Sequence, residues 1–221
     1  IDTLAVERIM NSFVRSEVDP FVLGTTGESV SLSVKQKYDL VKKVVSFNKR
    51  KVYAGISGNS LLESIEESIR YNDLGVDAVV AHLPFYYPVS DDQMLKYYEQ
   101  LANKTHCPLF LYNNPITTNI SIPINVIEKL SYHDKIVGIK DSERNMERLN
   151  ESIQLWSNRK DFVHFVGWAA QSTYSLIQGS DGIVPSTGNL TPGLYKELYI
   201  YAVEGNHMKA LVTDMSSTRN T

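Results

Sequence analysis

The sequence predicts an α/β fold, a (β/α)8 barrel that lacks its first strand in this chain. Short, uniformly apolar strand segments alternate with helical segments, which is typical of a parallel sheet covered by helices. Roughly seven such strands recur every 20 to 30 residues, and the chain opens on a helix with no strand before it. A doubly wound open sheet is the alternative, but no glycine-rich dinucleotide fingerprint follows any strand.

Apolar periodicity and turn residues place the individual elements. The first helix is capped by Asp2 or Thr3 and carries apolar side chains at helical spacing, and Ser33 caps the second. Pro123 opens a later helix, because proline suits the first helical position, and the tail from Leu211 is weakly specified. Helices are expected at 2–17, 33–47, 61–74, 91–104, 123–130, 144–157, 169–178 and 192–204. Strands are expected at 20–23, 52–56, 76–83, 108–112, 136–139, 162–166 and 181–184.

The strand at 136–139 runs into a lysine, Lys140. Strand alternation predicts that Ile136, Gly138 and Lys140 share one face, with Val137 and Ile139 on the other, and that Gly138 leaves room beside the lysine stem. A desolvated lysine has a lowered pKa, so its free amine can attack a ketone and form a Schiff base. In the alternative interpretation, Lys140 simply ends the strand with its ammonium in water.

Polar residues follow the carboxyl ends of the predicted strands, where the chemistry of such barrels is found. They are Thr25, Thr26, Tyr86, Tyr112, Lys140, Gly167, Ser186 and Thr187. Hydroxyl groups around a lysine can supply the proton relay that Schiff-base chemistry needs. The turn at 24–27 can offer backbone N–H groups and hydroxyls to the carboxylate of a 2-oxo acid.

Composition narrows the class of protein. The 221 residues are 43% hydrophobic, which suits one domain over 1–221, and the net charge of −3 disfavours nucleic acid and anionic membranes as partners. No segment has membrane-spanning length and Cys107 is the single cysteine, so a cytoplasmic protein is expected. The histidines show no metal-ligand spacing, and neither a metal nor another cofactor is expected.

Three motifs then point to a family. Gly24-Thr25-Thr26-Gly27-Glu28, Tyr112-Asn113-Asn114-Pro115 and Gly138-Ile139-Lys140-Asp141-Ser142, in this order, resemble the dihydrodipicolinate synthase / N-acetylneuraminate lyase family. These are pyruvate-type class I aldolases on a TIM barrel. The resemblance extends to about Glu204, but the family's first strand and its C-terminal helical extension are not visible in this chain. A barrel without its first strand is expected to expose two unpaired edges.

The resemblance implies a role for each matching residue. Lys140 would form the imine with pyruvate or another 2-oxo acid, and Tyr112 would be the general acid/base beside it. Thr25 would pass protons between Tyr112 and Tyr86, and the residue matching Tyr86 is typically lent to a neighbouring subunit, so a homodimer or homotetramer is expected. Thr26 would hold the carboxylate, in the turn that Gly24 begins.

Three further positions bear on the second substrate. Thr117 stands where the synthases carry an arginine that grips a carboxylate, which weakens that assignment. The acidic residues that follow the Gly167 position in the sialic acid lyases are absent, whereas Ser186 resembles the serine of those lyases and can bond an aldehyde-derived hydroxyl.

The resulting hypothesis is a lyase that uses a Schiff base to cleave or condense a 2-oxo-3-deoxy (sugar) acid, as an aldolase or a dehydratase, with a 2-oxo acid and an aldehyde as its small-molecule partners. Dihydrodipicolinate synthase itself, from pyruvate and aspartate semialdehyde, is one alternative. A non-catalytic barrel that binds a 2-oxo acid is another. A third is a phosphosugar-binding barrel that uses a cradle at 182–189.

Overall fold

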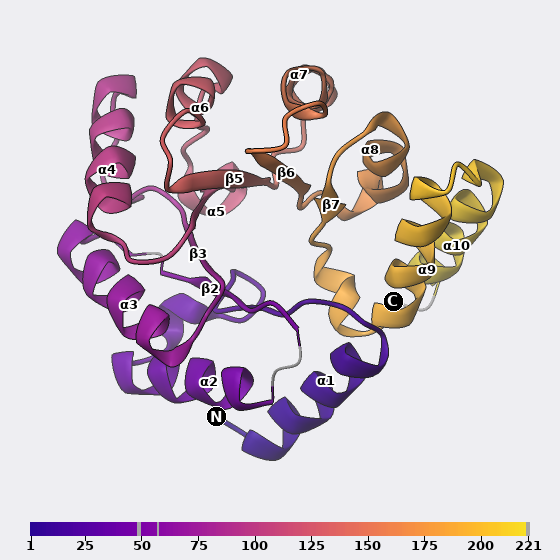
Figure 1. The fold of residues 1–221 in the computed structure, drawn as a ribbon, viewed down its shortest axis with the longest axis horizontal. Coiled ribbons are helices and arrows are strands. Elements are labelled where there is room, and N and C mark those ends of the chain that lie inside the picture. Colours follow the sequence, from indigo (N-terminus) through magenta and orange to yellow (C-terminus); the bar gives the residue numbers. More distant parts are fainter. Residues whose placement is uncertain (48–49, 57, 220–221) are drawn as a thin grey trace.

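The computed structural model describes residues 1–47, 50–56 and 58–219, so 48–49, 57 and 220–221 of the predicted domain lie outside it. Over the described residues, seven strands form one parallel sheet that is paired in chain order and curled into most of a barrel (Figure 1). The strands are β1 (Phe21–Val22), β2 (Tyr53–Gly55), β3 (Ala78–Ala81), β4 (Leu109–Asn113), β5 (Ile136–Asp141), β6 (Val163–Val166) and β7 (Gly182–Ile183). The predicted truncated (β/α)8 barrel is confirmed.

Helices surround the strands on the outside (Figure 1). They are α1 (Thr3–Arg15), α2 (Val34–Ser46), α3 (Leu61–Leu74), α4 (Asp91–Lys104), α5 (Pro115–Thr118), α6 (Ile124–Leu130), α7 (Met146–Trp156), α8 (Ser172–Gln178), α9 (Pro192–Val203) and α10 (His207–Arg219). Asp2 caps α1 by accepting from two backbone N–H groups, and Ser33 forms a capping box with Gln36, as the sequence predicts. None of the described helices is long and apolar enough to cross a membrane.

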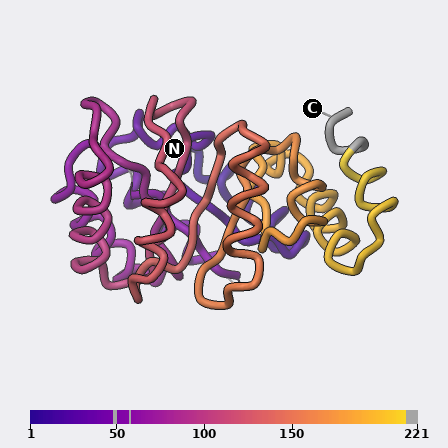
Figure 2. The backbone as a smooth tube through the Cα atoms, turned by 90° about the horizontal axis from the view of Figure 1, so that it is seen from above, coloured from indigo at the N-terminus to yellow at the C-terminus, as the bar shows by residue number. Residues whose placement is uncertain are grey.

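The structure differs from the prediction in three helical segments. Residues 211–219 of the tail belong to α10, which packs on α9 by burying Ala210 against Leu198 and Ala202 at one margin of the molecule (Figure 2). The expected helix at 169–178 begins with a separate 3₁₀ turn, Ala169–Gln171. The short helix α5 was not predicted, because its four residues show no periodicity.

The core has two layers, one on each face of the sheet. The larger layer lies between the sheet and the helices, and the smaller fills the barrel with aromatic rings. Within the barrel, Phe110 stacks on Phe165 with ring centroids 5.3 Å apart, and Tyr53 meets both rings edge to face. This aromatic layer lies beneath the carboxyl ends of the strands.

The faces of β5 differ from the predicted alternation at its start. Ile136 packs in the outer layer with Ile139, and Val137 packs inside the barrel, so the prediction for these two residues was wrong. The cause is a shift of register against β4, where Leu109 pairs with Ile136 but Phe110 pairs with Gly138. After the shift the alternation resumes, and Lys140 points inward.

The truncated edge is partly covered by α1. Within the described residues the sheet ends at β1 and β7, and α1 lies below this opening, in contact with α2 and α9 (Figure 1). A cavity of about 810 Å³ extends from Lys140 into the gap. Its walls include apolar side chains of α1 and residues of both edge strands, among them Val6, Met10, Phe13, Phe21, Val22, Gly182 and Ile183.

Candidate active site

Lys140 is the buried cation at the centre of the site. It lies on the inner face of β5, is 7% exposed, and its Nζ is 3.9 Å from the ring centre of Tyr112 and 4.7 Å from that of Phe21. Burial lowers the pKa of Lys140, although the neighbouring Tyr112 opposes the shift. The interpretation in which Lys140 ends the strand with its ammonium in water is therefore excluded, and the side chain is suited to present a free amine.

Gly138 allows β5 to pass close to the aromatic layer. A Cβ at this position would lie 2.5 Å from the Phe110 ring and 2.5 Å from the carbonyl oxygen of Val163. The missing side chain thus makes space for Phe110, and not beside the lysine stem as the sequence predicted. The glycine nevertheless supports the site, because it lets β5 carry Lys140 directly above the packed rings.

Tyr112 is the register partner of Lys140 on the neighbouring strand β4. The phenol is 4% exposed, and its oxygen lies 3.1 Å from the hydroxyl of Thr25. Burial opposes ionisation of the phenol, but the charge of Lys140 and hydrogen bonds with Lys140, Thr25 and Ser142 outweigh it, so the pKa of Tyr112 is lowered. A phenol with a lowered pKa can exchange protons at a reacting centre.

The turn at 24–27 brings Thr25 to the mouth of the barrel. Leu23 precedes it with φ of 58°, in the left-handed region, while its side chain stays buried. Gly55 permits this turn, because a Cβ there would lie 2.2 Å from the carbonyl oxygen of Leu23. Gly24, Thr26, Lys140 and Ser186 line the same cavity, so the structure brings these predicted residues to one space.

Three more of the predicted residues are not part of the lining of the cavity that Lys140 shares with the 24–27 turn. Tyr86 is 73% exposed on the loop after β3, where its ring meets Tyr87 and its backbone N–H donates to Asn59. Thr117 is exposed in α5, with its hydroxyl donating to a backbone carbonyl. A Cβ on Gly167 would meet the Ser142 hydroxyl at 2.1 Å, so its role in the structure is close packing.

Asn114 is a residue of the site that sequence reasoning missed. It is 7% exposed, and its side-chain amide donates to the Thr25 hydroxyl and to the Tyr112 phenol, both at 3.2 Å. The available signal was its place beside Tyr112 in the Asn-Asn-Pro turn. Turns are rich in asparagine for backbone reasons alone, so this signal does not distinguish a functional residue from a turn residue.

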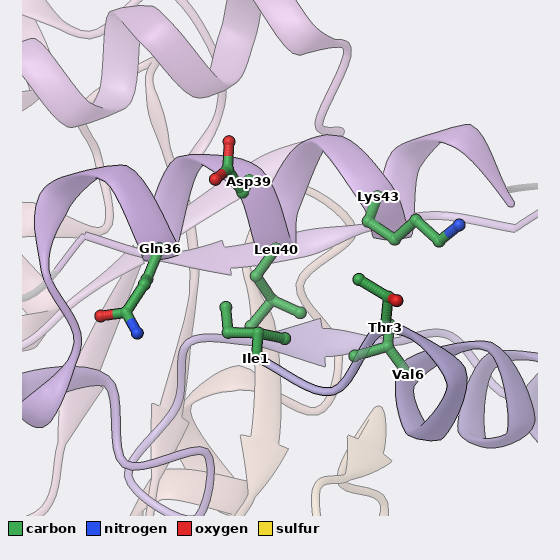
Figure 3. A pocket seen from close by; sticks show the side chains of 7 residues that line it. All are labelled: Ile1, Thr3, Val6, Gln36, Asp39, Leu40 and Lys43. Atoms are coloured by element: carbon green, nitrogen blue, oxygen red, sulfur yellow. The ribbon is translucent and has the colours of Figure 1, made fainter.

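A second cavity, of about 150 Å³, lies between the start of α1 and α2 (Figure 3). Two of its charged side chains are engaged in ion pairs, Lys43 with Glu7 and Asp39 with Lys35. Nothing at this cavity resembles the buried amine of the barrel. Within the described chain, moreover, no group of three or more His, Cys, Asp or Glu residues is placed to hold a metal ion.

The fold and the inward-facing amine define a (β/α)8-barrel protein whose polar residues meet at the carboxyl ends of the strands. Over residues 1–217 the sequence matches the profile of the dihydrodipicolinate synthetase family, and the chain belongs to this family. The resemblance seen in the three motifs is thereby confirmed.

Similar proteins agree with this assignment. A 4-hydroxy-tetrahydrodipicolinate synthase from Pseudoalteromonas atlantica is 32% identical over 194 residues, which cover 87% of this chain and 66% of that protein. An uncharacterized DapA-like lyase from Pyrococcus abyssi is 30% identical over 180 residues, 81% of this chain and 61% of that protein. The chain thus spans about two thirds of the length of such relatives, 61% to 66%.

Solved structures show the same fold. The dihydrodipicolinate synthase of Bacteroides thetaiotaomicron is 28% identical with a TM-score of 0.93, covering 99% of this chain and 74% of that one. The pyruvate complex of the enzyme from Acinetobacter baumannii has a TM-score of 0.92 at 24% identity, covering 97% of this chain and 74% of that one. At that identity the second likeness bears on the fold alone.

Proposed function

We propose that this protein is a class I lyase that forms a Schiff base between Lys140 and pyruvate or a related 2-oxo acid, and that it cleaves or condenses a 2-oxo-3-deoxy acid. The observation that carries the proposal is the amine of Lys140, buried at 7% exposure with its Nζ 3.9 Å from the Tyr112 ring centre. Membership of the family supports it.

In the first step the free amine of Lys140 attacks the carbonyl carbon of the 2-oxo acid. The hydroxyl of the resulting carbinolamine takes a proton from Tyr112 and leaves as water, and an iminium ion remains. The lowered pKa of Lys140 favours the attack, and the lowered pKa of Tyr112 favours the proton transfer. Thr26 and the backbone of the 24–27 turn would bind the carboxylate.

In the second step the iminium withdraws the electron pair of the bond between the third and fourth carbons. An enamine forms as the C4 hydroxyl loses its proton to Tyr112 through Thr25, 3.1 Å away, and an aldehyde is released. Protonation of the enamine and addition of water return the 2-oxo acid and the free amine. Condensation is the same sequence in reverse.

The second substrate is proposed from what the site contains. Thr117 cannot form the bidentate charged clamp expected of a synthase that binds aspartate semialdehyde, and its hydroxyl already donates to Asn114. Ser186 lines the same cavity as Lys140 and can bond a substrate hydroxyl. We therefore favour a polyhydroxylated 2-oxo-3-deoxy acid over aspartate semialdehyde.

A second copy of the chain is part of the proposal. Tyr86 is 73% exposed, and Asn59 fixes its loop by accepting from the backbone N–H groups of Phe85 and Tyr86. A large aromatic side chain held in an exposed position suits contact with another subunit. In a homodimer or homotetramer, Tyr86 would serve the site of a neighbour.

Borohydride trapping tests the proposal. With pyruvate and borohydride, intact-mass analysis is expected to show one reduced pyruvate per chain, absent in Lys140→Ala. The matched control is Lys196→Ala, since Lys196 lines the same cavity and pairs with the exposed Glu17 at 3.4 Å, and it should retain the adduct. A folded wild-type protein that forms no adduct would reject the mechanism. Release of pyruvate from a panel of 2-oxo-3-deoxy acids would then identify the substrate.

A further inference from the structure

We infer that Asn114 is a positioning residue of this site, whose side-chain amide donates to both Tyr112 and Thr25 and thereby stabilises the phenolate form of Tyr112. The inference deepens the proposed function and rests on it, because there Tyr112 is the group that exchanges protons. It is carried by the hydrogen bonds of a side chain that is itself 7% exposed.

The three polar atoms form a nearly equilateral triangle. Nδ2 of Asn114 lies 3.2 Å from the Thr25 hydroxyl and 3.2 Å from the Tyr112 oxygen, and those two oxygens are 3.1 Å apart. The two oxygens therefore subtend about 60° at the nitrogen, roughly half the angle between the two N–H bonds of an amide. One N–H is thus shared between both oxygens as a three-centre bond.

Ionisation of Tyr112 sets the direction of the hydrogen bond between its oxygen and the Thr25 hydroxyl, which either group can donate in the neutral state. An amide N–H can only donate, so it occupies an acceptor site on each oxygen. When Tyr112 is ionised, Thr25 turns its O–H toward the phenolate, which then accepts from Thr25 and Asn114 together. Bonds to a charged oxygen are about twice as strong as neutral ones, so the pair of donors favours the ionised form.

The other groups that face Tyr112 do not replace the Asn114 amide as a donor to the phenol oxygen. Lys140 approaches from β5, and His82, after β3, lies with its ring 6.3 Å away while burial lowers its pKa. The ring of Phe21 approaches edge to face from β1. Ser142 also bonds the phenol oxygen. Once Lys140 has become a neutral amine, Thr25, Ser142 and Asn114 remain as donors to that oxygen and keep the phenol able to receive a proton.

A titration without substrate tests the inference. Tyrosine labelled with ¹³C at Cζ is followed by NMR, and the Tyr112 signal is assigned with Tyr112→Phe. In Asn114→Leu, which keeps the branched outline but cannot donate, the midpoint for Tyr112 should rise by about one pH unit. Asn114→Asp, which can only accept and carries a charge, should raise it further.

The matched control is Thr118→Val. Thr118 is 3% exposed and its hydroxyl donates to the carbonyl of Asn114, so this variant loosens the same turn without removing a donor to Tyr112. Its Tyr112 midpoint should stay at the wild-type value. An unchanged midpoint in folded Asn114→Leu overturns the inference, and if that variant does not fold, an unchanged midpoint in Asn114→Asp does so.

The two proposals can fail separately. Borohydride trapping on the same variants across pH reports the imine, whereas the NMR titration needs no substrate. A raised midpoint in a protein that never forms an adduct would support the role of Asn114 and reject the lyase mechanism. An adduct on wild type, together with unchanged Tyr112 midpoints in the variants, would support the lyase mechanism and reject the role of Asn114.

Discussion

Two neighbouring register pairs of β4 and β5 face opposite sides of the sheet and differ in how their polar groups are bonded. Tyr112 pairs with Lys140 on the inner face, and Asn113 pairs with Asp141 one residue further on, on the outer face. The inner amine lies over aromatic rings. The outer carboxylate accepts from the Asn113 amide at 2.9 Å and from Arg148 at 2.7 Å.

The outer pair is the centre of a bonded cluster. Asp141 also accepts from the backbone N–H of Glu143, whose carboxylate accepts from Asn113 and from Ser121. The cluster ties β4 and β5 to α7 through Arg148, and the Asp141 carbonyl accepts from Gly167 after β6. One step along the paired strands therefore separates two kinds of residue. The inner pair has its polar groups at the cavity, and the outer pair fixes the strands that carry the inner pair.

The largest expected effect comes from breaking the inner pair. Tyr112→Phe keeps the ring beside Lys140 but removes the hydroxyl, so turnover should fall by about 10² to 10⁴-fold, or roughly 3 to 5 kcal/mol of barrier. Steady-state kinetics on the substrate found by pyruvate release measures this loss. A fall of less than about tenfold in a stably folded variant would mean that another group exchanges the proton.

Breaking the outer pair should act on stability. Asp141→Ala leaves the guanidinium of Arg148 and the amide of Asn113 without one of their two carboxylate acceptors in a buried setting, so the unfolding free energy should drop by about 4 kcal/mol. Urea denaturation measures the drop. The control is Arg159→Gln, which removes hydrogen bonds to Ser131 near the amino ends of the strands, at the opposite end of the barrel from Lys140.

The two variants are then compared in adduct formation per folded molecule. Asp141→Ala should form the pyruvate adduct about tenfold more slowly, because the strands that carry Lys140 and Tyr112 are less well fixed. Arg159→Gln should react at the wild-type rate. If Asp141→Ala loses less than about 1 kcal/mol, the outer cluster is not what holds the two strands together.

The convergence of Lys140, Tyr112 and Thr25 could be predicted, because the carboxyl ends of parallel strands meet at one end of a barrel whatever the details of packing. The parallel sheet of seven strands in chain order followed from the alternation of short apolar strands with helices. Both predictions depend on the order and direction of the strands, and the periodicity of apolar residues in the sequence indicates both.

What could not be predicted depends on local geometry. The outward packing of Ile136 follows from a register shift that an apolar run does not reveal. Asn114 is placed by the turn after β4, and a turn asparagine carries no mark of a hydroxyl partner 89 residues away. The role proposed for Tyr86 depends on contact with another subunit, which a single chain does not contain.

The smallest predicted effect concerns His164, a buried residue on the outer face of β6, and the pH dependence of stability. His164 is the register partner of Ile139 and is 1% exposed, and neither ring nitrogen has a hydrogen-bond partner among the residues described. Burial lowers the pKa of His164 to about 4, with nearby Asp141 and Arg148 acting in opposite directions. This imidazole therefore contrasts with the fully bonded carboxylate one strand away.

The lowered pKa makes folding sensitive to acid. Above the unfolded pKa of about 6.5, His164 is neutral in both states and its contribution is complete. As pH falls from about 6.5 to 4, only the unfolded chain binds the proton, so about 3 kcal/mol of stability is lost.

The variant His164→Leu abolishes this loss and removes an unpaired buried group. Between about pH 7.5 and 4.5, the fall in its unfolding free energy should be smaller than the fall in wild type by roughly 2.5 kcal/mol. Urea denaturation at both pH values measures this, with the exposed His106→Gln expected to differ from wild type by less than about 0.5 kcal/mol. Equal pH dependence in His164→Leu and wild type would show that a bonded partner or a solvent path satisfies the imidazole, and the contrast with Asp141 would then disappear.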